Sequence, residues 1–140
     1  MLTTEYKDEI LTKINQIPIV DFLQLKIISL SDGYCEAFVP RKKRYDGVFE
    51  SFHGGLLMTV ADSAACFAIF TRTGPSIRLT TTDMNIRFLV PCLTDVTAKA
   101  KVIKFGRTLC PVSIDLFDAA GKHVAASQVN YMLLNHSGNS

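Results

Sequence analysis

The segment from Gly54 to Thr73 has the sequence GGLLMTVADSAACFAIFTRT. Its side chains are apolar nearly all the way round a helix, which is typical of a helix buried in a core rather than laid on a surface. The few polar residues share one face, at positions i, i+3, i+4 and i+7: Thr59, Asp62, Ser63 and Cys66. The segment therefore predicts a central buried helix with one polar stripe.

The chain after Gly74-Pro75 changes to the period-two alternation of β-strands. The alternating stretches reach Pro91 and then cover residues 96–102, 112–116 and 124–134. Turns are expected at residues 105–107 (Phe-Gly-Arg) and 118–121 (Asp-Ala-Ala-Gly). Long successive strands with tight turns indicate an antiparallel sheet that is covered on one face.

The residues before the central helix predict smaller elements. Helical spacing of apolar residues indicates an amphipathic helix over about residues 4–16, with Thr4 as its cap. Pro18 is expected to open a short apolar turn through Phe22. A hairpin of two short strands is expected next, over residues 25–30 and 34–39, around the turn Ser31-Asp32-Gly33.

Together these elements predict one α+β domain, in which an antiparallel sheet wraps around a long central helix. The chain has 140 residues, enough for a single domain that buries roughly two-thirds of the surface of its unfolded chain. The domain is expected to cover residues 1–135, followed by a loose tail over residues 136–140.

The composition excludes several classes of protein. Apolar residues make up 48% of the chain and the formal net charge is only +2, so intrinsic disorder is excluded. So small a charge also argues against binding nucleic acid through a broad basic field. The three histidines show no metal-ligand spacing with cysteine or carboxylate, so neither a metal site nor a cofactor is expected: His53, His123 and His136.

Cysteine usage and the N-terminus predict a cytoplasmic protein. The four cysteines form no C-x-x-C pair and lie in apolar or strand-like contexts, as buried free thiols of a reducing compartment do: Cys35, Cys66, Cys92 and Cys110. The first nine residues, MLTTEYKDE, are too charged to begin a signal peptide. No uninterrupted apolar run approaches the length of a membrane span, so no membrane association is expected.

Asp62 is an ionisable carboxylate in the middle of the most apolar helix of the chain. An unpaired buried charge costs several kcal/mol, so such a carboxylate needs partners or a chemical role. One interpretation is a cleft-edge carboxylate that is hydrogen-bonded to Thr59 or Ser63. The other is a general base or nucleophile, because perturbed carboxylates concentrate in active sites.

His53-Gly54-Gly55 lies just before the same helix. Two glycines let the backbone pass close to a ligand, and free N–H groups at a helix start hold an anion or a developing oxyanion. Gly54 lies eight residues before Asp62, which is about 12 Å along a helix. A functional site must therefore be shared between two subunits or use a folded-back loop, and a plain turn is the other interpretation.

A basic run, Arg41-Lys-Lys-Arg44, follows Pro40. Such a run is either a solvated loop or a site that captures a phosphate-bearing ligand. Basic residues of the later hairpin are expected to add to it. The predicted phosphate contacts are Arg41, Lys43, Arg44, Lys104 and Arg107, with Lys101 beside them.

Three stretches carry a family pattern: HGGLLMTVAD at residues 53–62, TDMNIRFLVP at 82–91 and GRT at 106–108. Their order and spacing resemble the hotdog-fold acyl-CoA thioesterases of the phenylacetyl-CoA (PaaI-like) branch, over about residues 20–134. The H-G-G-x6-D and D-x-N-x-x-F-x-x-P elements are fairly specific for this branch and are not specific for a substrate.

The resemblance implies a hotdog domain that dimerises edge to edge, often as a dimer of dimers, with acyl-CoA sites across the dimer interface. It gives Asp62 the role of activating water or attacking the thioester. The backbone N–H of Gly54 polarises the thioester carbonyl, while His53 precedes it in the motif and Gly55 supports the turn. A site that spans two subunits also removes the difficulty of the 12 Å spacing estimated above for one helix.

The resemblance also implies a hydroxyl on the partner's strand that holds the attacking water. By alignment this role falls on Thr81, with Thr80 or Thr82 in its place if a bulge shifts the register.

Two positions depart from the family pattern N-x-x-G-x-x-H-G-G. Gly47 stands where the family has Asn, and Glu50 stands where it has Gly. The role of that Asn in binding the thioester or the water is vacant unless Asp46 or His53 takes it. The departure leaves a non-catalytic acyl-CoA-binding module open as an alternative function.

An enoyl-thioester hydratase is a third hypothesis. Hotdog proteins of that kind need a His paired with the helix carboxylate. Cys66 and Phe67 stand where such a His would lie close to Asp62, so the sequence argues against this activity.

Overall fold

The computed structural model describes residues 2–134 of the chain. It contains three α-helices, one short 3-10 helix and six strands: α1 (Thr4–Ile14), α2 (Pro18–Leu23), β1 (Lys26–Ser31), β2 (Tyr34–Val39), η1 (Lys43–Tyr45), α3 (Gly54–Thr73), β3 (Arg78–Phe88), β4 (Val96–Val102), β5 (Leu109–Asp118) and β6 (His123–Leu134). The predicted tail and the domain boundary at residue 135 lie outside the described residues.

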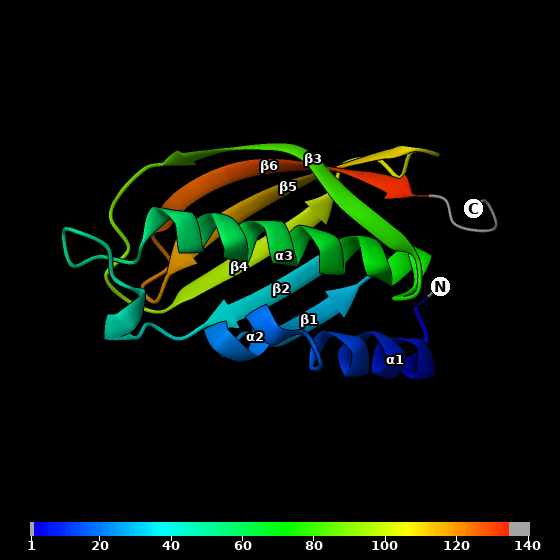
Figure 1. The fold of residues 1–140 in the computed structure, drawn as a ribbon, viewed down its shortest axis with the longest axis horizontal. Coiled ribbons are helices and arrows are strands. Elements are labelled where there is room, and N and C mark those ends of the chain that lie inside the picture. Colours follow the sequence, from blue (N-terminus) through cyan, green and yellow to red (C-terminus); the bar gives the residue numbers. More distant parts are fainter. Residues whose placement is uncertain (1, 135–140) are drawn as a thin grey trace.

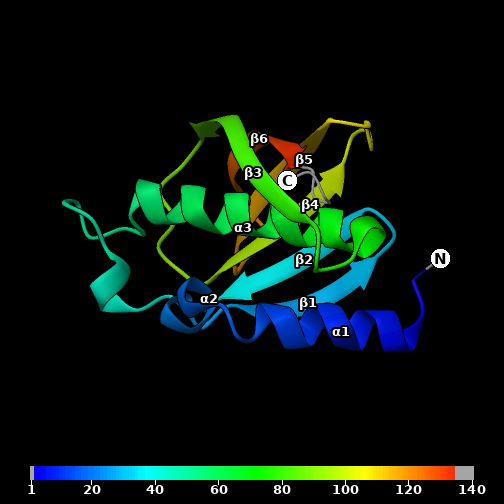
Figure 2. The same ribbon diagram turned by 45° about the vertical axis from the view of Figure 1, so that its right-hand side comes forward.

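The six strands form one antiparallel sheet in the order β1-β2-β4-β5-β6-β3. The sheet curves around α3, and α1 and α2 lie beside β1 (Figures 1 and 2). This confirms the predicted α+β architecture of a sheet wrapped around one central helix. The strands β1 and β3 form the two edges of the sheet.

The central helix α3 begins and ends where its sequence predicts, at Gly54 and Thr73. Among the described residues it is the one helix long and apolar enough to cross a membrane, yet most of that apolar window is buried inside the domain. All four residues of the polar stripe are only partly buried, so the stripe reaches the edge of the core. The remaining faces pack against the sheet and α1.

The N-terminal elements differ from the prediction in two details. The cap of α1 is Thr3 and not Thr4, because Thr3 is extended (φ −87°, ψ 168°) and its side chain accepts the N–H of Tyr6 at 3.1 Å. Residues 18–23 form the short helix α2 instead of a turn, since Pro18 occupies a first-turn position where its missing N–H costs nothing. The hairpin of β1 and β2 is confirmed to within one residue.

A β-bulge at Thr82 sets which residues of β3 face the helix. Thr81 pairs with Tyr131 and Asp83 pairs with Asn130, so Thr82 is the extra residue in β3. The bulge resets the alternation, and both Thr81 and Met84 are partly buried while Thr82 and Asp83 are exposed. Without it, one end of β3 would present the wrong face to α3.

Candidate active site

The Asp62 carboxylate is held by two hydroxyl groups from the sheet. Its Oδ1 accepts a hydrogen bond from Thr81 Oγ1 at 2.7 Å and another from the Tyr131 hydroxyl at 3.0 Å. Neither predicted local partner is used, since the Thr59 hydroxyl donates to the Gly55 carbonyl at 3.0 Å. The helix α3 and the strands β3 and β6 therefore converge on one half-buried carboxylate.

Thr81 reaches Asp62 within the same chain, whereas the family resemblance placed this hydroxyl on the partner's strand. The bulge that the sequence analysis considered is present, and it turns Thr82 away from Asp62. The Thr82 hydroxyl instead donates to the Asn130 carbonyl at 3.1 Å. Thr80 is exposed. Thr81 is therefore the threonine that the strand register delivers to the carboxylate.

Tyr131 is a site residue that sequence reasoning missed. The residue is 6% exposed, and the backbone carbonyl of Asp62 also lies 3.0 Å from its hydroxyl, so the single hydroxyl proton is shared between this carbonyl and Oδ1. Burial, together with the nearby Cys66 and Asp62, raises the pKa of Tyr131 far above its ordinary value, so the hydroxyl keeps its proton. The alternation of β6 was the available signal, but only the pairing of Tyr131 with Thr81 places it at Asp62.

Cys66, one turn after Asp62 on the polar stripe, is a thiol and not a nucleophilic thiolate. Burial, and then the Asp62 carboxylate, raise the pKa of Cys66 to about 12. All four cysteines are free, and Cys35, Cys92 and Cys110 are buried. The expectation of free thiols is therefore confirmed.

The start of α3 presents one open N–H group. His53 Nδ1 accepts the N–H of Gly55 at 2.9 Å and so caps the helix. The N–H of Gly54, at the first helical position, has no acceptor among the described residues. Gly54 therefore offers an unused backbone N–H at the helix start, whereas the N–H of Gly55 is used by the cap.

One chain does not bring Gly54 and Asp62 together. They lie eight residues apart on α3, about 12 Å along its axis. Thr81 and Tyr131 donate hydrogen bonds to Asp62, and neither makes a hydrogen bond to the start of α3. The open N–H group and the carboxylate thus lie at different points of one helix.

A pocket of about 500 Å³ lies beside Gly54. Its lining is mainly apolar and comes from the loop before α3, the start of α3, the end of β3 and the segment after it: Phe49, Ser51, Phe52, Gly54, Leu57, Phe88, Leu89, Val90, Pro91 and Cys92. A Cβ atom on Gly54 would lie 3.2 Å from Phe88 Cζ. A side chain at this position would therefore make a tight contact with the Phe88 ring.

Arg41, a predicted phosphate contact, instead holds the loop between η1 and α3 in place through its guanidinium group. Its guanidinium pairs with the Asp46 carboxylate and donates to the carbonyls of Leu93 at 2.7 Å and Glu50 at 3.0 Å. This loop extends beyond the sheet at the N-terminal end of α3 (Figure 1). Asp46 is held in the ion pair, which argues against its replacing the missing family Asn.

The other predicted basic residues do not form one patch in a single chain. The Arg44 guanidinium lies 5.4 Å from the ring centre of Phe22 and 5.6 Å from that of Tyr45. Lys104 and Arg107 follow the far end of β4, which runs about 20 Å away from the basic run. Lys43, Lys104 and Arg107 are exposed, on two separate ends of the sheet.

Glu50 adopts a left-handed backbone conformation, φ 60°, at the position where the family pattern has Gly. Such a conformation costs about 1–2 kcal/mol for a residue with a Cβ. We expect Glu50→Gly to raise the free energy of unfolding by about 0.5–1 kcal/mol, after the greater chain entropy of glycine is subtracted. Urea unfolding of both proteins measures the change.

Gln24 is the matched control for this prediction, since it is the other non-glycine residue with positive φ, 55°, among the described residues. Its side-chain amide donates to the Asp21 carbonyl at 2.7 Å, and Gln24→Gly loses that bond. The gain at Gln24 should therefore be smaller. A loss of stability in Glu50→Gly would show that the Glu50 side chain makes a compensating interaction.

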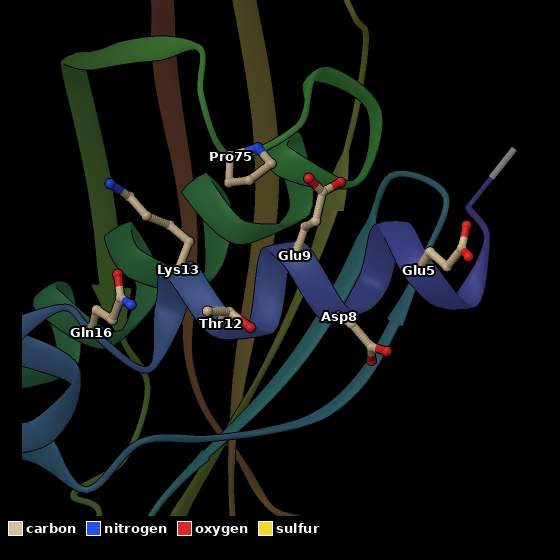
Figure 3. A pocket seen from close by; sticks show the side chains of 7 residues that line it. All are labelled: Glu5, Asp8, Glu9, Thr12, Lys13, Gln16 and Pro75. Carbon is tan, nitrogen blue, oxygen red and sulfur yellow. The ribbon is translucent and has the colours of Figure 1, made fainter.

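A hollow on the outer side of α1 takes no part in the site. Figure 3 shows it between α1 and Pro75. Three of its lining side chains are carboxylates and one is basic, which does not suit the phosphates of an acyl-CoA: Glu5, Asp8, Glu9, Thr12, Lys13, Gln16 and Pro75. None of the predicted site residues lines it.

The two described histidines make no contact with Asp62. His53 caps α3, and His123 Nε2 lies 2.8 Å from the Asp115 carboxylate while its ring stacks on Phe117. Within residues 2–134, no group of three His, Cys, Asp or Glu side chains could hold a metal ion. Among the described residues, no His is therefore paired with Asp62, the helix carboxylate that enoyl-thioester hydration would use.

A curved antiparallel sheet wrapped around one long central helix defines a hotdog protein. A family model of the thioesterase superfamily matches residues 49–125. A Saccharolobus solfataricus protein named as an esterase is 31% identical over 116 residues, which are 82% of this chain and 81% of that protein. The chain therefore belongs to the thioesterase superfamily.

Other relatives and solved structures agree with this assignment. Human acyl-coenzyme A thioesterase 13 is 28% identical over 107 residues, 73% of this chain and 74% of that protein. The E. coli PaaI structure has a TM-score of 0.88 at 20% identity, covering 98% of this chain and 99% of PaaI. A Silicibacter pomeroyi thioesterase family protein has a TM-score of 0.86 at 24% identity, with 94% and 99% covered. These structures confirm the hotdog fold.

Proposed function

We propose that this chain hydrolyses acyl-CoA thioesters to the free acid and CoA. The observation that carries the proposal is the Asp62 carboxylate on α3, which accepts hydrogen bonds from the hydroxyls of Thr81 and Tyr131. The same helix begins with the open N–H of Gly54. An anchored carboxylate and a free backbone donor are the two groups that acyl transfer requires. The relative named acyl-coenzyme A thioesterase 13 supports a CoA thioester as substrate.

The complete site is proposed to form between two copies of the chain. Gly54 and Asp62 of one chain are too far apart to hold one thioester. The edge strand β3, which carries Thr81, leaves one of its sides unpaired among residues 2–134. Pairing of two such edges gives a homodimer with Gly54 of one copy facing Asp62 of the other, and two dimers can associate further.

The chemistry begins with attack on the thioester carbonyl carbon. In one route Asp62 takes a proton from water, the water oxygen forms the new C–O bond, and the carbonyl oxygen becomes an oxyanion that Gly54 N–H stabilises. Collapse breaks the C–S bond, and the CoA thiolate takes the proton from Asp62. In the other route Asp62 attacks the carbon itself, and the C–S bond breaks with CoA leaving as its thiolate. Water then hydrolyses the resulting mixed anhydride to the free acid and Asp62, and the proton released goes to the thiolate.

The apolar pocket beside Gly54 is proposed to receive the acyl group. Its volume of about 500 Å³ and its phenylalanine side chains suit a medium-length or aromatic acyl chain. Exposed Lys43, Lys104 and Arg107 are the remaining candidates for contacts with the CoA phosphates. The free, mainly buried thiols support a reducing, cytoplasmic location.

Hydrolysis of a panel of short, medium, long and aromatic acyl-CoAs tests the proposal. We expect release of CoA with the highest kcat/KM for medium or aromatic acyl groups, and no hydration of crotonyl-CoA. Tight binding of acyl-CoA without release over hours would overturn the proposal in favour of a binding module. Equilibrium binding of each acyl-CoA in the same buffer separates that outcome from a substrate missing from the panel.

A further inference from the structure

The two hydroxyls that hold Asp62 converge on the same carboxylate oxygen. Thr81 Oγ1 and the Tyr131 hydroxyl both donate to Oδ1, at 2.7 and 3.0 Å. Oδ2 of Asp62 has no hydrogen-bond partner among the described residues, although the side chain is only half-buried. The two oxygens of this carboxylate therefore have different environments.

We propose that Tyr131 is a positioning residue, which with Thr81 anchors Oδ1 of Asp62 and leaves Oδ2 as the oxygen that reacts. This inference rests on the proposed thioester hydrolysis and specifies which atom performs it. In the general-base route Oδ2 takes the proton of the attacking water, and in the covalent route Oδ2 forms the bond to the carbonyl carbon. In both routes Oδ1 keeps its two hydrogen bonds.

Tyr131 suits this role better than a surface residue would, because its own position is fixed. Tyr131 is buried on β6, within the hydrophobic core of the domain. The same hydroxyl also lies 3.0 Å from the backbone carbonyl of Asp62, so its position is fixed relative to the backbone of α3. Burial raises the pKa of the Tyr131 hydroxyl, which keeps its proton available for donation.

A single anchor would leave the carboxylate free to turn. With Thr81 alone, the carboxylate can turn about the Cβ–Cγ bond through a range of angles while one oxygen keeps its hydrogen bond. A second donor from a different strand holds Oδ1 from two directions and restricts that rotation. Groups of this kind usually change the reaction rate by 10- to 100-fold, because the reacting atom must stay within about 0.5 Å of its productive position.

Steady-state kinetics of Tyr131→Phe test the proposal. We expect kcat to fall about tenfold or more while KM changes less than about twofold, since the hydroxyl acts on the carboxylate and not on the substrate. Tyr45→Phe is the matched control, because it removes another buried tyrosine hydroxyl, which donates to the Phe22 carbonyl away from Asp62. A full kcat in Tyr131→Phe, or an equal loss in Tyr45→Phe, would overturn the proposal.

A crystal structure of Tyr131→Phe gives a readout that does not depend on activity. We expect the Asp62 carboxylate to rotate or to occupy two rotamers, whereas Tyr45→Phe leaves it as in the parent protein. An unmoved, singly occupied carboxylate in Tyr131→Phe would contradict the positioning role even if the protein hydrolyses no thioester. If the parent protein hydrolyses no thioester but the carboxylate is mobile in Tyr131→Phe, the result would support the positioning role and reject the proposed function.

Discussion

Asp62→Asn is expected to lower kcat by about 10³-fold without unfolding the protein. An amide cannot accept the proton of water or attack a thioester, and loss of such a group costs 10²- to 10⁴-fold. Asn has the same shape, and its amide oxygen still accepts the hydrogen bonds that Thr81 and Tyr131 donate to Oδ1. Release of CoA from the best acyl-CoA of the panel measures the effect, and urea unfolding checks the fold.

Asp115→Asn is the matched control for this prediction. Asp115 is also a partly exposed carboxylate with one close partner, His123 at 2.8 Å, but it lies on β5 and does not contact Asp62. It should retain the parent kcat. If Asp62→Asn retained more than about a tenth of the activity, the observed loss would fall short of that expected for a base or nucleophile.

Gly54→Pro is expected to lower kcat by about 10²- to 10³-fold, which is the usual cost of removing one oxyanion donor. Proline deletes the backbone N–H, and the structure accepts it at this point. Gly54 is the first residue of α3, where that N–H has no acceptor among the described residues, and His53 before it is extended with ψ 130°. KM should change less than kcat, because the donor bonds most strongly to the developing oxyanion.

Gly54→Ala separates the loss of the N–H from the effect of added bulk. Alanine keeps the N–H but places a Cβ atom about where proline has one, 3.2 Å from Phe88 Cζ. We expect Gly54→Ala to retain most of kcat. Equal losses in the two variants would assign the effect to crowding of the pocket and not to the oxyanion donor.

The same two variants show whether a site is shared. A hybrid dimer of one Asp62→Asn chain and one Gly54→Pro chain has one intact site if Gly54 of one copy serves Asp62 of the other. Refolding the two inactive variants together should then restore a substantial part of the parent activity. No recovery in hybrids isolated by two different affinity tags would mean that each chain builds its site alone.

Much of this protein could be predicted from local patterns. The bounds of α3, the alternating strands and the two predicted turns after Pro91 all follow from the period of apolar side chains and from turn residues. The half-exposed polar stripe was predicted in the same way, and with it the position of Asp62. These features depend on residues that are close in the sequence, so a single sequence contains them.

The partners of Asp62 could not be predicted in that way. Thr81 and Tyr131 come from strands that are distant in the sequence, and a single bulge decides which threonine faces the helix. Likewise, the basic run predicted Arg41 as a phosphate contact. Its ion pair with Asp46 and its hydrogen bonds to two carbonyls could not be foreseen, because they exist only after the loop folds.

The sequence by itself determined the elements, the central helix and the carboxylate on it, because hydrophobic periodicity and turn chemistry act locally. Only the tertiary structure decided that Oδ1 of Asp62 is anchored by Thr81 and Tyr131 and that the N–H of Gly54 stays open. The physical reason is that hydrogen bonds across strands depend on register. A shift of one residue turns every following side chain of a strand to the opposite face.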